Sequence, residues 1–157
     1  MVPFRELIER LRGEAGDLDG VVQRALRAWQ KAQHLSSEQE FYLDSVALNL
    51  HGFYAGVERL FELIARRIDQ KPPSGEAWHR DLLRQMAQDL PDIRPAAISQ
   101  ESAVALDNFR RFRHLVQNIY VINLQADKMA ELTTALPSLW DKLRGELLAF
   151  ADFLEDI

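Results

Sequence analysis

The sequence predicts an all-α fold, an antiparallel bundle of four to five helices. Apolar residues recur at helical spacing along most of the chain, and no segment shows the sustained two-residue alternation that strands require. Proline- and glycine-containing segments at 71–75 and 91–95 interrupt the pattern. With 157 residues, 47% hydrophobic and 27% charged, the chain is expected to form a single domain over residues 1–157.

The first helix is predicted from about Phe4 to Gln33, because its apolar residues repeat every three or four positions. Three glycines, Gly13, Gly16 and Gly20, lie between its two apolar halves. Each glycine inside a helix costs about 1 kcal/mol relative to alanine. We therefore expect a kink or a short break there.

The second helix is predicted to follow Ser37, because Ser37 and Glu40 have the spacing of a capping box placed before an apolar run. It extends to about Asp69 and stops before the segment 71–75. Apolar residues surround much of its middle, so this helix is expected to be central or to lie in an interface. Small residues there would let another backbone come close: Gly52, Ala55 and Gly56.

Three further helices complete the predicted bundle. The third runs from about Glu76 to Leu90 and is closed by prolines. The fourth runs from near Ser99 to about Leu124, and the fifth from Asp127 to about Glu155. Pro137 lies in the middle of the fifth helix, where it must kink the helix or divide it in two.

Composition excludes several classes of protein. The absence of cysteine rules out a disulfide scaffold, a zinc ribbon and a thiol nucleophile. The longest uncharged stretches, 45–57 and 114–126, are shorter than the roughly 18 apolar residues of a membrane span. The N-terminus lacks the apolar region of a signal peptide, so a cytoplasmic protein without membrane contact is expected. A net charge of -5 argues against nucleic-acid binding over the whole surface, so any RNA contact must be local.

Residues 109–124 concentrate polar groups more than any other part of the chain. On a helical wheel the apolar residues form one continuous face: Ala105, Phe109, Phe112, Leu115, Val116, Ile119 and Ile122. The opposite side carries a polar strip: Arg110, Arg111, Arg113, His114, Gln117 and Asn118, with Tyr120 at its margin. The same side also holds apolar residues: Ala103, Leu106, Val121 and Leu124. Apolar residues bracketing a basic strip predict a surface that a second subunit covers.

This strip is the candidate functional site. Arginine offers a fork of donors that matches phosphate oxygens, so three arginines with a histidine and a tyrosine suit a phosphodiester. The alternative is the usual one for arginine clusters on helices, namely a solvated face or salt bridges between subunits. The other histidines, His34, His51 and His79, lack metal-ligand spacing, and no glycine-rich phosphate loop occurs. No metal and no cofactor is therefore expected.

The segment 113–120, reading RHLVQNIY, resembles the signature of HEPN domains, in particular the HepT-like toxins of bacterial and archaeal toxin–antitoxin pairs. That signature is arginine, a polar residue, three variable residues, histidine, one variable residue and tyrosine. The segments 47–62 and 136–140 also resemble parts of the HepT-like family. The resemblance covers nearly the whole chain and implies a HEPN-like helical bundle.

The resemblance implies a homodimer whose facing motifs form a composite ribonuclease site without metal. The RNA 2′-hydroxyl would attack the adjacent phosphate, Arg113 would stabilise the developing charge, and Arg110 or Arg111 would position phosphate. It also implies a partner, a minimal nucleotidyltransferase antitoxin that in some systems adds AMP to the motif tyrosine. Tyr120 occupies that position.

One position departs from the family pattern. Asn118 stands where the family has its catalytic histidine, and an amide cannot exchange protons near neutral pH. His114, one helical turn earlier on the same face, is the only imidazole nearby that could replace it. The sequence thus leaves two principal hypotheses, a metal-independent RNA endonuclease with weak or absent activity and a non-catalytic HEPN subunit that binds nucleotide or docks the transferase. A structural bundle with an unrelated partner would explain the composition but not the motif.

Overall fold

The computed structural model describes residues 3–34, 36–118 and 126–157, and within these ranges it is helical, with one isolated bridge between Leu90 and Arg94 and no strand. The elements follow in order: α1 (Arg5–His34), the 3-10 turn η1 (Ser36–Glu38), α2 (Gln39–Arg67), α3 (Trp78–Met86), α4 (Gln100–Asn118) and α5 (Ala126–Glu155). The predicted all-α bundle is confirmed. Within the described ranges, no helix is both long and apolar enough to cross a membrane.

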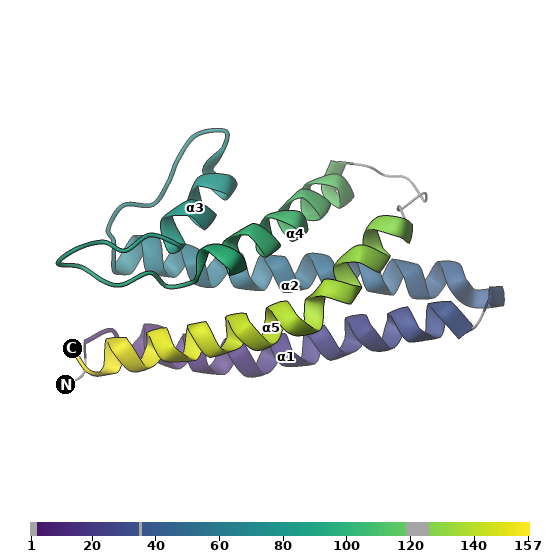
Figure 1. Cartoon of the computed structure of the whole chain (residues 1–157), viewed down its shortest axis with the longest axis horizontal. Coiled ribbons are helices and arrows are strands. Elements are labelled where there is room, and N and C mark those ends of the chain that lie inside the picture. Colours follow the sequence, from purple (N-terminus) through teal and green to yellow (C-terminus); the bar gives the residue numbers. More distant parts are fainter. Residues whose placement is uncertain (1–2, 35, 119–125) are drawn as a thin grey trace.

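Helix α2 is central. It packs against α1, α3, α4 and α5, as its apolar circumference predicts. In Figure 1, α1 and most of α5 lie along one side of α2, the first part of α5 crosses α2, and α3 and α4 lie along the other side. Helix α5 runs back along α1, so helices from the two ends of the chain share one interface.

An aromatic cluster joins three of these helices. The Phe53 ring of α2 meets the Phe109 ring of α4 at a centroid distance of 5.5 Å and the Trp140 ring of α5 at 5.8 Å, both edge to face. Such pairs contribute about 0.5–1.5 kcal/mol beyond the area they bury. The Trp140 indole also donates a hydrogen bond to Asp19 Oδ1 of α1, at 3.0 Å. Four helices are thereby held together in the middle of the bundle.

Helix α1 is continuous, so of the predicted kink or short break at its glycines, the break is absent. Gly13, Gly16 and Gly20 all lie on its exposed side. The buried stripe on the other side is uninterrupted: Leu7, Ile8, Leu11, Ala15, Leu18, Val22, Ala25, Ala28 and Ala32. Because most helical stability comes from packing of the apolar face, this stripe outweighs the unfavourable propensity of exposed glycine.

The capping box predicted for α2 is also absent. Helix α2 begins at Gln39, and its N-cap residue Glu38 makes no side-chain capping hydrogen bond. The 3-10 turn η1 includes Ser37, which therefore does not stand at the cap position. Gln39 Nε2 instead donates to the carbonyl of Ala32, at 3.0 Å, and ties the start of α2 to α1.

Helix α3 is shorter than predicted, ending at Met86 rather than near Leu90. The cause is Arg94, whose buried guanidinium pairs with Asp69 at 2.6 Å and whose side chain is 0% exposed. Its remaining donors bond to backbone carbonyls, namely those of Gln85, Gln88 and Pro95. The carbonyl of Gln85 lies in the last turn of α3, where carbonyls lack intrahelical partners, and Arg94 supplies one.

Helix α5 contains Pro137 and remains one helix, which changes direction partway along its length in Figure 1. This is the kink that the sequence allowed as an alternative to two helices. Proline removes an intrahelical hydrogen bond. The hydroxyls of Thr133 and Thr134 donate to carbonyls one turn earlier, an arrangement that also bends helices.

Candidate functional site

Arg113 points into the bundle rather than out to solvent. Its Nη1 donates to Glu58 Oε1 of α2 at 3.0 Å, and its side chain is only 19% exposed. The helical wheel places Ala103 and Leu106 on the polar strip with it, whereas both are buried. Helix α4 packs against α3 as well as against α2 and α5, so more of its circumference is covered than one apolar face would supply.

Glu58 is the centre of this cluster. It is 4% exposed, and its second oxygen lies 2.7 Å from Nδ1 of His79 on α3. A buried carboxylate is costly unless hydrogen bonds and an opposite charge compensate for its lost hydration. Arg113 supplies both. The carboxylate thus joins α2, α3 and α4 and fixes the orientation of the motif arginine.

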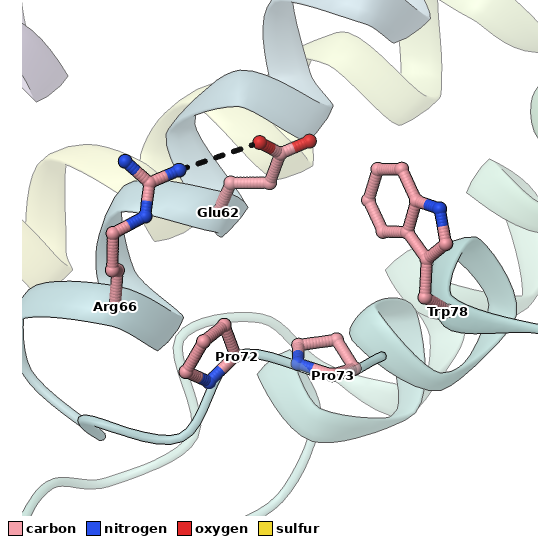
Figure 2. A pocket seen from close by; sticks show the side chains of 5 residues that line it. All are labelled: Glu62, Arg66, Pro72, Pro73 and Trp78. Atoms are coloured by element: carbon pink, nitrogen blue, oxygen red, sulfur yellow. Dashed lines mark ion pairs between the residues drawn. The ribbon is translucent and has the colours of Figure 1, made fainter. Parts of the chain in front are cut away.

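The His79 ring stacks on Trp78, with a centroid distance of 3.6 Å and an interplanar angle of 30°. Trp78 also lines a cavity of about 250 Å³. Figure 2 shows the indole facing the Glu62–Arg66 ion pair of α2 across this cavity, with Pro72 and Pro73 beside it. The cavity therefore adjoins the His79 end of the cluster.

Two buried polar atoms near Glu58 have no hydrogen-bond partner among the described residues, namely the Tyr54 hydroxyl and Arg113 Nε. A buried polar group without a partner costs about 1–3 kcal/mol. Tyr54 precedes Glu58 by one turn of α2, so both donors belong to the same cluster. The cluster is thus charged, buried and short of acceptors among the described residues.

Two side chains of α2 have shifted pKa values in this environment. Burial raises the pKa of Tyr54, and the negative charge of Glu58 adds to the effect. Burial lowers the pKa of His51, and the positive charge of Arg113 adds to that effect. Both groups are therefore favoured in their neutral forms.

Arg110 and Arg111 are held by their own helix. Arg110 Nε donates to Asp107 Oδ1 at 2.7 Å, and Arg111 Nη2 lies 3.0 Å from Asp107 Oδ2. The Arg110 side chain is 23% exposed and that of Arg111 is 67% exposed. Arg111 is accordingly a surface group, whereas Arg110 lies at the edge of the cluster around Tyr54.

The remaining predicted site residues lie toward the end of α4. His114 is on the exposed side of the helix, one residue after the inward-pointing Arg113. Asn118 is the last residue of α4, and its side chain lies outside the described part of the structure. Tyr120 lies outside the described residues altogether. Among the residues that are described, no three histidine, aspartate or glutamate side chains are grouped as a metal site would require.

Sequence reasoning missed Glu58, His79, Trp78 and Tyr54. One signal was present in α2, where His51, Tyr54 and Glu58 follow each other at helical spacing inside a largely apolar stretch. Polar groups on a face that is otherwise buried indicate a specific partner. No such signal marked His79, because its partner lies 21 residues away on another helix.

Comparison with known proteins gives one match. A family model described as HepT-like protein matches residues 45–154, which extend from α2 to α5 and include the motif. No curated protein and no solved structure matches the chain.

Proposed function

Because the chain belongs to the HepT-like family, we propose that it is the toxin-type subunit of a HEPN/nucleotidyltransferase toxin–antitoxin pair and cleaves RNA as a homodimer. Family membership itself supports a HEPN-type toxin–antitoxin protein. Our proposal goes further in four respects: the cleavage of RNA, the homodimer, the nucleotidyltransferase partner and a cytoplasmic location.

The observation that carries it is the buried pairing of Arg113 with Glu58. One guanidinium nitrogen is occupied by the carboxylate, while Nε has no partner among the described residues. Because Nε is buried, a phosphate oxygen bound beside the guanidinium would accept from its Nη groups. A positive charge held in place before the reaction stabilises charge that develops on phosphate without the cost of reorganisation.

The proposed reaction needs little besides this charge and two proton transfers. The RNA 2′-oxygen attacks phosphorus, its proton passes to a base, and the 5′-oxygen leaves with a proton from an acid. A 2′,3′-cyclic phosphate remains on one product. Asn118 cannot take either proton-transfer role, and general acid–base catalysis contributes about 100- to 10,000-fold. We therefore expect the chain to bind RNA and cleave it slowly.

The test is the substitution Asn118→His with Arg113 intact. Cleavage of a fluorescently labelled RNA should rise at least about tenfold above that of the parent chain, and adding Arg113→Ala to the same variant should abolish the gain. Equal cleavage by the parent and the histidine variant would contradict the assignment of position 118. It would indicate His114 as the base, which His114→Ala tests directly.

The alternative function is a non-catalytic HEPN subunit that binds nucleotide or docks the transferase. The amide at position 118 favours it, because an amide keeps the hydrogen-bonding capacity of the site and removes proton transfer. If neither the parent chain nor the Asn118→His variant cleaves RNA, Tyr120 becomes the residue of interest. Mass spectrometry after incubation with the partner transferase and ATP would then detect AMP on Tyr120, and Tyr120→Phe would prevent it.

A further inference from the structure

A groove of about 600 Å³ lies between α3 and α4 and shares no lining residue with the Trp78 cavity. Its volume falls in the range of pockets that bind small ligands, roughly 300–1,000 Å³. Three arginines line it, Arg80 and Arg84 of α3 and Arg111 of α4. Asp107 is the one acidic side chain among the described residues that line it, so the groove is positive in a chain of net charge -5.

The charges of Arg80 and Arg84 are not compensated within the described part of the chain. Both side chains are exposed, and neither forms an ion pair with any residue in the described ranges. They stand four residues apart on a helix of nine residues, and like charges at this spacing destabilise a helix. Arg80 also lies in the first turn of α3, where the helix dipole disfavours positive charge. The repulsion between the two arginines and the position of Arg80 weaken the isolated helix and would favour an anion bound beside it, whereas Arg84 lies in the last turn, where the helix dipole favours a positive charge.

The floor of the groove is apolar. Leu83 and Ala103 are buried beneath it, and Val104 is 68% exposed although it is aliphatic. A free phosphate would need only the arginines. An apolar floor between cationic walls instead suits a ligand with alternating charged and flat apolar parts, as in a single-stranded nucleic acid with unstacked bases.

The groove is linked to the candidate site through Asp107. Asp107 lines the groove, accepts a hydrogen bond from Arg110 and forms an ion pair with Arg111. Arg111 faces the groove, whereas Arg110 and Arg113 both lie close enough to Tyr54 to act on its hydroxyl electrostatically. The two sides of α4 are therefore connected through one carboxylate.

We propose that the groove between α3 and α4 binds single-stranded RNA, with phosphates on Arg80, Arg84 and Arg111 and a base or ribose on Val104. This inference rests on the proposed function, since it names the surface that guides the substrate toward Arg113. It assigns a binding role to two arginines of α3, far from the motif in sequence.

The experiment measures binding of a fluorescein-labelled single-stranded RNA, roughly 15 nucleotides long to span one such site, by anisotropy at several salt concentrations. The parent chain is compared with the double variant Arg80→Gln/Arg84→Gln. The matched control is Arg24→Gln/Arg27→Gln, which removes two arginines from α1, a helix that does not pack against α3 or α4. Circular dichroism checks that each variant is folded, and Arg80→Lys/Arg84→Lys keeps the charge.

The groove variant should lose at least about tenfold in affinity, and the slope of log K against log salt should become shallower by about 1.4, which is the effect of two lost phosphate contacts. The control should change neither quantity, and the lysine variant should keep most of the slope. A duplex of the same sequence should bind more weakly than the single strand.

The experiment distinguishes failure of the groove assignment from failure of the proposed function. If the parent chain binds no RNA, both are overturned. If it binds RNA and the groove variant keeps the parent affinity and slope, only the groove assignment is overturned. Loss of transferase binding in that variant, with unchanged RNA affinity, would also overturn it and would assign the groove to a protein partner.

Discussion

Glu58 shows how much of the site depends on a single side chain. Its two oxygens bond to residues of two other helices, Arg113 at 3.0 Å and His79 at 2.7 Å. Removing one partner of a buried ion pair leaves an uncompensated charge, which is more damaging than replacing both partners. The carboxylate is thus required for the position of the motif arginine as well as for the packing of α2 against α3 and α4.

Tyr54→Phe should leave the fold intact and raise the free energy of unfolding by up to about 1 kcal/mol, because it removes a buried hydroxyl without a partner among the described residues. Urea denaturation measures this, with an unchanged m value indicating the same two states. A loss of stability greater than about 1 kcal/mol would show instead that the hydroxyl is hydrogen-bonded in solution.

His51 should make stability depend on pH. Its pKa is lowered in the folded chain, chiefly by burial and further by the charge of Arg113. The unfolded chain therefore binds the proton more tightly, and stability falls as the pH drops below the ordinary histidine value of about 6.5. His51→Gln should reduce the difference in unfolding free energy between about pH 7.5 and about pH 5.5, which bracket that value.

The control for this measurement is His34→Gln, which removes an exposed imidazole at the end of α1. Urea denaturation of the parent and both variants at the two pH values separates the contributions. A difference that is the same in His51→Gln as in the parent would contradict the assignment of the pH dependence to His51.

At the scale of the helix, replacing different glycines by alanine is expected to change stability in opposite directions. A Cβ added at Gly16, Gly20 or Gly52 would meet nothing within 4 Å, whereas one added at Gly56 would lie 2.7 Å from a methyl of Leu18. Alanine at an open helical position stabilises by about 0.5–1 kcal/mol. Leu18 is buried between α1 and α2, and overpacking there costs about 1–3 kcal/mol.

Gly52→Ala and Gly56→Ala therefore form a matched pair on α2. The first should raise the melting temperature and the second should lower it, while Gly16→Ala and Gly20→Ala on α1 should follow the first. Calorimetry of the four variants checks the signs. A stabilising Gly56→Ala would mean that α1 and α2 are less closely packed than the structure shows.

The helices themselves could be predicted because each buries an apolar stripe, and this stripe is visible in the local sequence of α1, α2 and α5. Their ends were less predictable, since Arg94, which bonds to the last turn of α3, is held in place by Asp69 at 25 residues' distance in the sequence. The candidate site likewise has a part that could be predicted from local sequence and a part that could not. Arg113 could be predicted from its motif, but its partner Glu58 lies 55 residues away and is brought close only by tertiary packing.

At the scale of the whole molecule, α1 completes the hydrophobic core, although the family match does not include this helix. The match begins at residue 45, whereas α1 spans Arg5–His34 and packs against both α2 and α5. Its buried stripe belongs to the same hydrophobic core as the matched helices. The family-specific part of the chain therefore depends on a helix outside the match for its burial.

The proposed homodimer makes a prediction at this scale. Phe41 and Leu48 of α2 are 72% and 70% exposed, and they share one face at heptad spacing. Leu48 lies one turn before His51, whose pKa responds to Arg113, so this apolar face adjoins the candidate site. We expect light scattering at micromolar concentration to give the mass of two chains, and Leu48→Glu to give that of one.

The control for the dimer is Ile93→Glu, which places the same charge at a residue that is 48% exposed in the connection between α3 and α4. It should leave the dimer intact. A parent chain that is monomeric at this concentration would contradict the composite site, and a Leu48→Glu chain that remains dimeric would place the interface on another face.

The start of α1 and the end of α5 lie close together at one end of the bundle (Figure 1), where Arg12 of α1 bonds to Asp152 and Glu155 of α5. A short linker could join these ends, and the chain could be reopened at the exposed segment 74–76 between α2 and α3. Such a circular permutant would keep every helix and the pairing of Arg113 with Glu58. The order in which the helices are synthesised is therefore separable from the architecture that they build.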